Sequence, residues 1–267
     1  WNIHTSRYDE IIENNKNVNK IIESLPENID RILIFGGDGS INDVLNKLYN
    51  NNQLDRYKIG AMPTGSGNSV MHDLKLLNIK NALEVALGNN FKKADLNKIK
   101  FDNFNRISVS VLGWGMFSYG NIRAEKLRWL GPIRYDVASI ITLLEKRMHR
   151  AKITIDNIEK DITCAFIVGC NSVHTGKGMK VAPNGGFFDG KMDLIQVNEN
   201  ISRLQIAKVF KKVYDGTHIE LPYVKSSQVN TFRIDPGYKT FYNVDGDVVE
   251  SQVASVEVLP KAFKLLI

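Results

Sequence analysis

Two glycine-rich segments, each placed directly after a short apolar run, constrain the fold of this chain more than any other feature. The first is Gly36-Gly37-Asp38-Gly39, which follows residues 31–35, and the second is Pro63-Thr64-Gly65-Ser66-Gly67-Asn68, which follows residues 59–62. Helical spacing of apolar residues occupies 8–24, 41–49 and 70–77. A short apolar run that is entered from a helix and left through glycines is typical of a buried parallel strand. The order helix, strand, helix, strand, helix predicts a doubly wound α/β layer over residues 1–94.

From about Asp95 onward the pattern changes to alternating runs separated by Gly, Asn and Pro turns, which indicate antiparallel strands. These runs cover residues 106–112, 152–158, 162–169, 191–197, 231–234, 240–244 and 254–259. Helical patterns interrupt them at 133–150 and 201–214. Residues 95–267 are therefore predicted to form a mostly antiparallel β-sandwich domain whose last residues pack back on the first domain. A parallel layer normally opens with a strand, whereas this sequence opens on a helical pattern, so we expect that a first strand is missing.

Composition and charge limit the classes of function. No window approaches 18 uninterrupted apolar residues and no secretory signal opens the sequence, so we expect a cytoplasmic protein with peripheral, transient membrane association. The two cysteines are too few for a disulfide framework, and the five histidines have no ligand spacing, so no intrinsic metal site is predicted. The net charge of +6 favours phosphate or anionic lipid. Scattered basic residues without a recognition motif argue against a nucleic-acid partner.

The two glycine loops have the chemistry of a phosphate site. Their backbone N–H groups can approach a phosphate closely, and each loop leads into a helix, whose dipole favours anions at its start. Asp38 lies among the glycines, where its carboxylate could accept a proton from an attacking hydroxyl group. The alternative is a tight turn with an N-capping aspartate. Because neighbouring parallel strands end at one crevice, two such loops favour a nucleotide site. No G-x-x-x-x-G-K-[ST] motif is present, so this is not a P-loop protein.

The motifs resemble a known family. Gly36-Gly-Asp-Gly with Asn42-Asp43, followed by Pro63-x-Gly-Ser-Gly-Asn68, resembles the catalytic domain of diacylglycerol kinases and sphingosine kinases, whereas NAD kinases share only the Gly-Gly-Asp-Gly part. Further motifs resemble the sphingosine and ceramide kinase branch: Gly113-Trp114-Gly115, Glu125-Lys-x-Arg128-x-Leu-Gly-x-x-Arg134, Ala182-Pro183, Asp189-Gly190, residues 215–224 and Val244-Asp245-Gly246-Asp247. The resemblance spans nearly the whole chain and implies an ATP-dependent lipid kinase whose Mg²⁺ arrives with ATP.

The same resemblance implies a role for each matching residue. Asp38 would be the base that activates the lipid hydroxyl, and Arg128 and Arg134 would neutralise phosphate oxygens. Asp95 would lie at the domain junction. The other implied ATP-binding residues are Gly36, Gly37, Gly39, Ser40, Thr64, Gly65, Ser66, Gly67, Asn68, Asp245, Gly246 and Asp247. The implied lipid-binding residues are Asp43, Tyr119, Asn121, Ile140 and Leu144.

Three positions depart from the family pattern. At two of them, Asp43 and Asp247, this chain has an aspartate where most relatives have a glutamate. The third is Asn121, which stands where sphingosine kinases have an aspartate that pairs with the ammonium group of the lipid. An amide supplies no counter-charge. The family's opening Asn-Pro-x-Ser-Gly loop is also absent, in line with the missing first strand.

The acceptor therefore stays open at this point. A sphingoid base comes first, because most motifs match that branch. Ceramide, diacylglycerol and monoacylglycerol follow, because they carry no ammonium group and would not need an aspartate at position 121. An NAD kinase and a lipid-binding pseudokinase are the remaining alternatives. The second glycine loop argues against the former, and the presence of Asp38 and both arginines argues against the latter.

Overall fold

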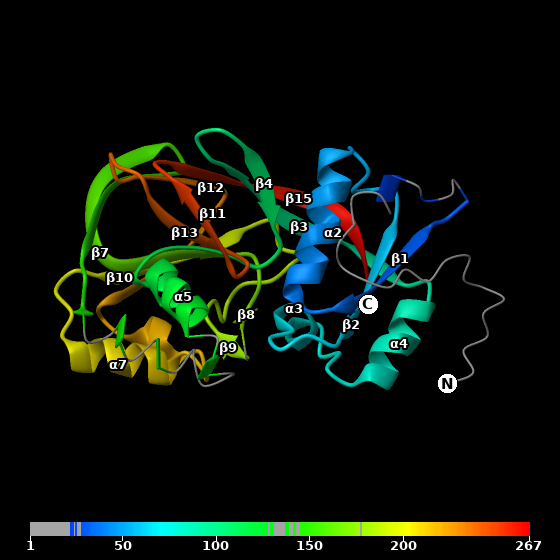
Figure 1. Ribbon diagram of the computed structural model, residues 1–267, viewed down its shortest axis with the longest axis horizontal. Helices are drawn as coiled ribbons and strands as arrows, with labels where there is room; N and C mark the ends of the chain where they lie inside the picture. Colours follow the sequence, from blue (N-terminus) through cyan, green and yellow to red (C-terminus); the bar gives the residue numbers. More distant parts are fainter. Residues whose placement is uncertain are drawn as a thin grey trace.

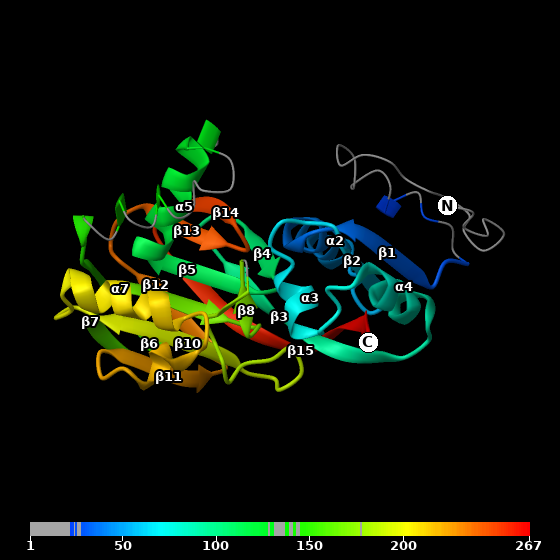
Figure 2. The same cartoon turned by 90° about the horizontal axis from the view of Figure 1, so that it is seen from below.

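The computed structural model describes residues 22–23, 25, 28–127, 129–130, 137–138, 141–142, 145–176 and 178–267. Within them the chain forms an α/β part beside a β-rich part, as Figures 1 and 2 show from two directions. The fold class predicted from the sequence is confirmed. The predicted helix over 8–24 lies almost wholly outside the described residues.

The α/β part is built on two parallel strands. β1 (Arg31–Gly36) pairs with β2 (Lys58–Pro63), and α2 (Asp38–Asn50) connects them. The buried residues of α2 include Ile41, Leu45 and Leu48, whose spacing of four and three places them on one helical face. The helix therefore packs this face into the core of the α/β part, and its first turn includes Asp38 and Gly39 of the first glycine loop.

Two short helices follow β2. They are α3 (Ser69–Asp73) and α4 (Ile79–Leu87). The helix predicted over 70–77 is wrong beyond Asp73, because Lys75 adopts a left-handed φ of 59° that ends it. The side chain of Asn78 then caps α4, a helix that was not predicted from the sequence.

One strand joins the two parts of the molecule. β15 (Ala254–Leu266) pairs antiparallel with β3 (Phe91–Lys100), and near its end it also pairs in parallel with β2 through Lys264 and Leu265. A single sheet of 13 strands therefore runs from β1 at one edge into the β-rich part. Figure 2 shows β15 and β3 extending from the α/β part into the β-rich part.

Asp95, which the resemblance places at the domain junction, fastens this region. Its side chain is buried, and its two oxygens accept hydrogen bonds from the backbone N–H groups of Gly190 and Lys261, both at 2.7 Å. Lys261 lies in the bulge that interrupts the pairing of β15 with β3. Asp95 therefore ties β3, the bulge of β15 and the loop before β10 to one point.

The β-rich part consists mainly of antiparallel strands. They are β4 (Asn105–Ser108), β5 (Val111–Gly115), β6 (His149–Ile155), β7 (Ile158–Cys170), β8 (His174–Thr175), β9 (Met179–Lys180), β10 (Met192–Asn198), β11 (Val224–Val229), β12 (Thr231–Asp235), β13 (Thr240–Val244) and β14 (Asp247–Ser251). Its helices are α5 (Met116–Lys126), α7 (Arg203–Lys212) and the 3₁₀ helix η3 (Thr217–Glu220). Within the described ranges no helix is long and apolar enough to cross a bilayer.

Both helices predicted for this part need correction at their ends. Of the helix predicted over 133–150, residues 137–138, 141–142 and 145 are helical, whereas residues 133–136, 139–140 and 143–144 lie outside the described residues. Its end is wrong because His149 and Arg150 pair with β7 as the start of β6. The helix predicted over 201–214 is α7, which is shorter. It begins after Ser202, whose side chain forms a capping box with Gln205.

Candidate active site

The two glycine loops touch each other. A Cβ atom on Gly65 would lie under 3.0 Å from the backbone of Gly37, so only a glycine fits there. Asn68, in the left-handed region at φ 55°, closes the second loop on itself. Its amide accepts from the N–H of Gly65 at 3.0 Å and donates to the carbonyl of Gly65 at 2.8 Å. The backbones of the two loops thus form one continuous surface.

Asp38 fixes this arrangement. Its two carboxylate oxygens accept hydrogen bonds from the backbone N–H groups of Ser69 (2.9 Å) and Val70 (3.1 Å), the first residues of α3. Asp38 therefore caps α3 from the neighbouring strand–helix unit. Within the described part of the chain no side chain caps α2 itself, so the first-turn N–H groups after Gly37 are available to an anion. The predicted phosphate-binding role of the loops is consistent with this geometry and stays a prediction.

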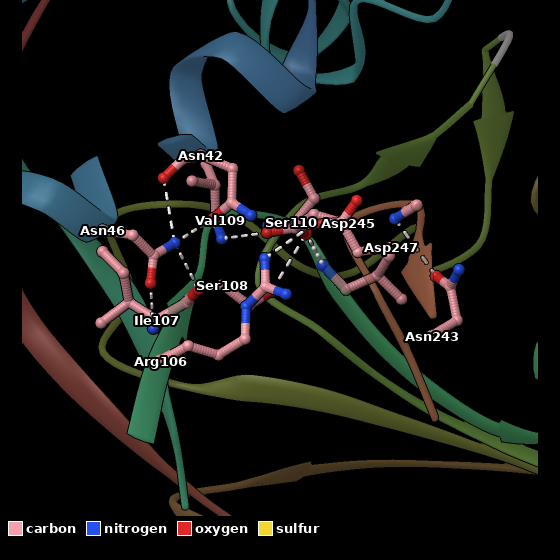
Figure 3. A network of polar contacts seen from close by, with 12 residues as sticks. Asn42, Asn46, Arg106, Ile107, Ser108, Val109, Ser110, Asn243, Asp245 and Asp247 are labelled. Atoms are coloured by element: carbon pink, nitrogen blue, oxygen red, sulfur yellow. Dashed lines mark hydrogen bonds and ion pairs between the residues drawn. The ribbon is translucent and has the colours of Figure 1, made fainter. Parts of the chain in front are cut away.

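A network of polar contacts from the β-rich part also reaches α2, and Figure 3 shows it in close view. The turn of residues 245–247 between β13 and β14, here called the acidic turn, carries Asp245 in a left-handed conformation at φ 50°. The Asp245 carboxylate accepts hydrogen bonds from the Ser108 hydroxyl (3.0 Å) and from the backbone N–H groups of Val109 (2.8 Å), Ser110 (2.9 Å) and Val111 (2.8 Å). Burial raises the pKa of Asp245, and the four donors oppose this effect. Because these donors surround its oxygens, the structure gives Asp245 a positioning role.

Two asparagines connect α2 to this network. The Asn46 amide donates to the carbonyl of Ile107 at 3.0 Å and accepts from the N–H of Ile107 at 2.8 Å. Asn42 is buried one helical turn earlier. With its amide nitrogen facing Asp245, it donates to that carboxylate at 3.2 Å and accepts from the Arg106 guanidinium at 2.7 Å. Asn42 lies one turn after Asp38, so α2 holds the glycine loops and the acidic turn together.

Two further carboxylates flank this network. Asp247 forms an ion pair of 3.0 Å with Arg106. Burial raises the pKa of Asp43, the nearby Asp247 raises it further, and Arg106 opposes both. Asp43 and Asp247 are the two positions where this chain is one methylene shorter than the family pattern, and they face the same guanidinium. Arg106 could not be predicted as a site residue, because an arginine in an alternating strand pattern carries no signal of its own.

A hairpin of the β-rich part also contacts α3. Asp73 accepts from the backbone N–H groups of Val173 (2.8 Å) and His174 (3.0 Å), and its carboxylate lies 2.5 Å from Nδ1 of the His174 ring. The ring of His72 stacks on that of His174 at 5.3 Å. At the start of α3, the Ser69 hydroxyl lies 3.5 Å from the carbonyl of Gly176. The β8–β9 hairpin is therefore fastened to the helix that Asp38 caps, a contact that the sequence did not predict.

The predicted lipid-binding residues are described only in part. Tyr119 in α5 stacks on the ring of His149 at 5.4 Å and meets Phe241 edge-on at 6.2 Å. Among the predicted ATP- and lipid-binding residues, Arg128, Arg134, Ile140 and Leu144 lie outside the described residues, as does the side chain of Asn121. The structure therefore places Tyr119 in an aromatic cluster and leaves the other predicted roles as predictions.

Two buried titratable groups predict a measurable pH dependence of stability. Burial raises the pKa of Asp193 to about 6 and lowers that of His149 to about 4. Between about pH 4 and 6 the native Asp193 binds more protons than in the unfolded chain, so its effect lowers the free energy of unfolding as pH rises. The unfolded His149 binds more protons over nearly the same window, so its effect raises that free energy and the two offset each other.

Asp193→Asn removes the falling contribution and keeps that of His149. Between pH 4 and 6.5 the free energy of unfolding of the variant should therefore rise by about 3 kcal/mol more than that of the wild type. His149→Phe should show the opposite slope. Urea unfolding at four pH values measures both. Asp189→Asn, which removes an exposed neighbour with only a minor effect on the pKa of Asp193, should retain nearly the wild-type profile. Identical profiles for Asp193→Asn and wild type would contradict the assignment.

Residues 6–99 match the diacylglycerol kinase catalytic domain, and residues 110–267 match the YegS C-terminal NAD kinase beta sandwich-like domain. The chain is 29% identical over 251 residues to a protein named "Probable lipid kinase YegS-like" of Shewanella frigidimarina, covering 92% of this chain and 79% of that protein. It is 27% identical to a diacylglycerol kinase of Mycobacterium tuberculosis (89% and 76% covered). It is 23% identical to sphingosine kinase 1 of Arabidopsis thaliana (78% and 53% covered).

The fold is also that of solved structures. The crystal structure of a diacylglycerol kinase from Bacillus anthracis superposes with a TM-score of 0.76 at 19% identity, covering 96% of this chain and 83% of that one.

Proposed function

This chain belongs to the family of lipid kinases that join a diacylglycerol kinase catalytic domain to a YegS-type C-terminal domain, and from that premise we propose that it transfers the γ-phosphate of ATP to a primary hydroxyl group of a long-chain lipid. The observation that carries the proposal is the convergence on α2. The two glycine loops meet at its N-terminus through Asp38, the acidic turn is held to it through Asn42, and Asn46 holds the neighbouring strand β4 to it at Ile107. Three segments far apart in the sequence thus surround one helix start.

Each element has a chemical task in this proposal. The free N–H groups at the start of α2 and the glycine backbones bind phosphate oxygens, because a helix start offers oriented donors and a favourable dipole. Asp38 accepts the proton of the lipid hydroxyl, since each of its oxygens has a second lone pair beyond the bond to α3. Arg128 and Arg134 neutralise charge on the transferred group.

Magnesium is proposed to arrive with ATP. Among the described residues no group of three or more metal-ligating side chains is gathered, so a dedicated protein cage is not part of the proposal. Asp43 and Asp247 lie close enough that one carboxylate raises the pKa of the other, and oxygen ligands of this kind suit Mg²⁺ bound mainly by phosphates and water. When bound, the ion would balance phosphate charge.

Two acceptor classes fit this mechanism. A sphingoid base is supported by the motifs that the second domain shares with sphingosine kinases. An uncharged acylated lipid (ceramide or an acylglycerol) is supported by Asn121, which supplies no carboxylate to pair with an ammonium group. We propose in addition that the enzyme meets its lipid at a membrane surface. Trp129 and Leu204 are 79% and 84% exposed, and Lys208 and Lys211 follow Leu204 on the same face of α7.

The test is transfer of radiolabelled phosphate from ATP to a panel of sphingosine, ceramide, diacylglycerol, monoacylglycerol and NAD, each lipid in mixed micelles. We expect label on at least one lipid and none on NAD. Label on NAD alone would favour an NAD kinase, and no label on any acceptor would favour a lipid-binding pseudokinase. Either result overturns the proposal.

A further inference from the structure

Arg106 is the one cation among the described residues of the polar network that joins α2 to the acidic turn (Figure 3). Its Nη2 atom donates to the Asp247 carboxylate at 3.0 Å and to the amide oxygen of Asn42 at 2.7 Å. Its Nε atom is buried without a partner, and its Nη1 atom donates to no described residue. The side chain is 17% exposed. Most donors of this guanidinium are therefore unused.

The two partners hold the guanidinium with unequal strength. Asn42 is buried and is itself held by the Asp245 carboxylate, so it sets the position of the guanidinium. The side chain of Asp247, in contrast, is 65% exposed. An exposed carboxylate exchanges an ion pair for water at little cost. Arg106 is therefore fixed by one partner and can release the other to a competing anion.

Arg106 also lies close to the start of α2. Asn42 follows Asp38, the first residue of α2, by four residues, which is about 6 Å along the helix axis. Side chains of a helix lean toward its N-terminus, so the Asn42 amide and the guanidinium bonded to it lie toward the end of α2 that no described side chain caps. A triphosphate bound at that end is long enough to span one helical turn.

The other charged groups around Arg106 are acidic. Burial raises the pKa of Asp43, the nearby Asp247 raises it further, and Arg106 opposes both. Without the guanidinium, phosphate oxygens at the start of α2 would face carboxylates alone in this network. The planar fork of an arginine also matches two oxygens of a phosphate group, which a single ammonium does not. The charge and the shape of Arg106 thus both suit a phosphate.

We propose that Arg106 is a further phosphate-binding residue of the kinase: its guanidinium exchanges Asp247 for phosphate oxygens of ATP, while Asn42 keeps it in place. Nη1 donates to the phosphate directly, and Nη2 does so once Asp247 has turned to water. This inference rests on the proposed lipid kinase function and adds a residue to its nucleotide site.

The test is direct binding of ATP, measured by isothermal titration calorimetry in EDTA and again with Mg²⁺. We expect Arg106→Gln to weaken ATP binding by about 10- to 100-fold, the range for hydrogen bonds to a charged group. Arg106→Lys keeps the charge without the fork and should recover part of the loss. Arg233→Gln is the matched control, because Arg233 also pairs with an aspartate at 3.1 Å but lies on β12; it should bind ATP like the wild type.

Asp247→Asn separates a phosphate contact from mere support of the acidic turn. If Arg106 only held the turn, Asp247→Asn would break the same ion pair and weaken ATP binding as Arg106→Gln does. If Asp247 competes with the phosphate, Asp247→Asn should tighten ATP binding in EDTA by about 2- to 5-fold, the range for an exposed ion pair. The two variants should therefore change the affinity in opposite directions.

The outcomes also separate this inference from the proposed function. ATP binding by Arg106→Gln at the wild-type strength, or weaker binding by Asp247→Asn in EDTA, would overturn the inference and leave lipid phosphorylation standing. A urea unfolding curve shows whether each variant is folded; if Arg106→Gln is not, Arg106→Lys and Asp247→Asn decide. Absence of ATP binding by the wild type in both buffers would remove the proposed function and the inference with it.

Discussion

Asp38→Asn is expected to lower the rate of phosphoryl transfer by about 10²- to 10⁴-fold, the usual contribution of a general base. The asparagine carbonyl can keep one of the two hydrogen bonds to α3, so the loops should remain in place. It cannot accept the proton of the lipid hydroxyl. The loss should therefore appear in kcat, with a smaller change in the KM for ATP. Initial rates at saturating lipid and varied ATP measure kcat and the KM for ATP. A urea unfolding curve measures whether the variant keeps its stability.

The alternative is that Asp38 serves only to cap α3, and Asp73 offers a matched control for it. Asp73, the last residue of α3, also accepts two backbone N–H bonds, from Val173 and His174, and so fastens the β8–β9 hairpin to α3, but it has no predicted part in the chemistry. If capping alone matters, Asp73→Asn and Asp38→Asn should lower activity and stability by similar amounts. We expect instead that Asp73→Asn costs stability and keeps most of the rate.

The glycine loops could be predicted because their signal is local. A strand, a glycine turn and a helix start follow one another within a dozen residues, and this order occurs twice. The two loops therefore had to end at the same edge of a parallel pair. The contact between Gly37 and Gly65 follows from that topology, although the sequence alone gives no distance.

The acidic turn could be predicted only as a motif. The Asp245 carboxylate binds backbone N–H groups of Val109, Ser110 and Val111, and backbone donors leave no trace in the identity of the residues that carry them. The same limit applies to Arg106, which meets Asp247 only after the strands have paired. Contacts made by the backbone, or formed across more than a hundred residues, need the assembled sheet.

The missed strands have a different cause. β3 carries Lys92, Lys93, Lys98 and Lys100, which break the apolar alternation, and only its pairing along β15 shows that it is central. β11 has four exposed residues in succession, and among the described strands it pairs with β10 alone, as expected of an edge strand. In both strands tertiary pairing, rather than side-chain pattern, decides the conformation.

Asp245→Asn is expected to lower the free energy of unfolding by about 3 to 5 kcal/mol, the largest stability effect that we predict. The carboxylate satisfies three backbone N–H groups and the Ser108 hydroxyl in a fully buried position. An asparagine can keep the one oxygen that accepts from Ser108, Ser110 and Val111, but its NH₂ group would then face the N–H of Val109 in a buried position. Urea unfolding at pH 7 measures the change.

Asp247→Asn, two residues along the same turn, is the matched control. Its side chain is 65% exposed and its one described ion pair, to Arg106, lies at the surface, so stability should change by less than about 0.5 kcal/mol. A stability change as small for Asp245→Asn would contradict the positioning role. If the role holds, the folded fraction of Asp245→Asn should also transfer phosphate more slowly, because the turn that carries Asp247 would no longer be held against α2.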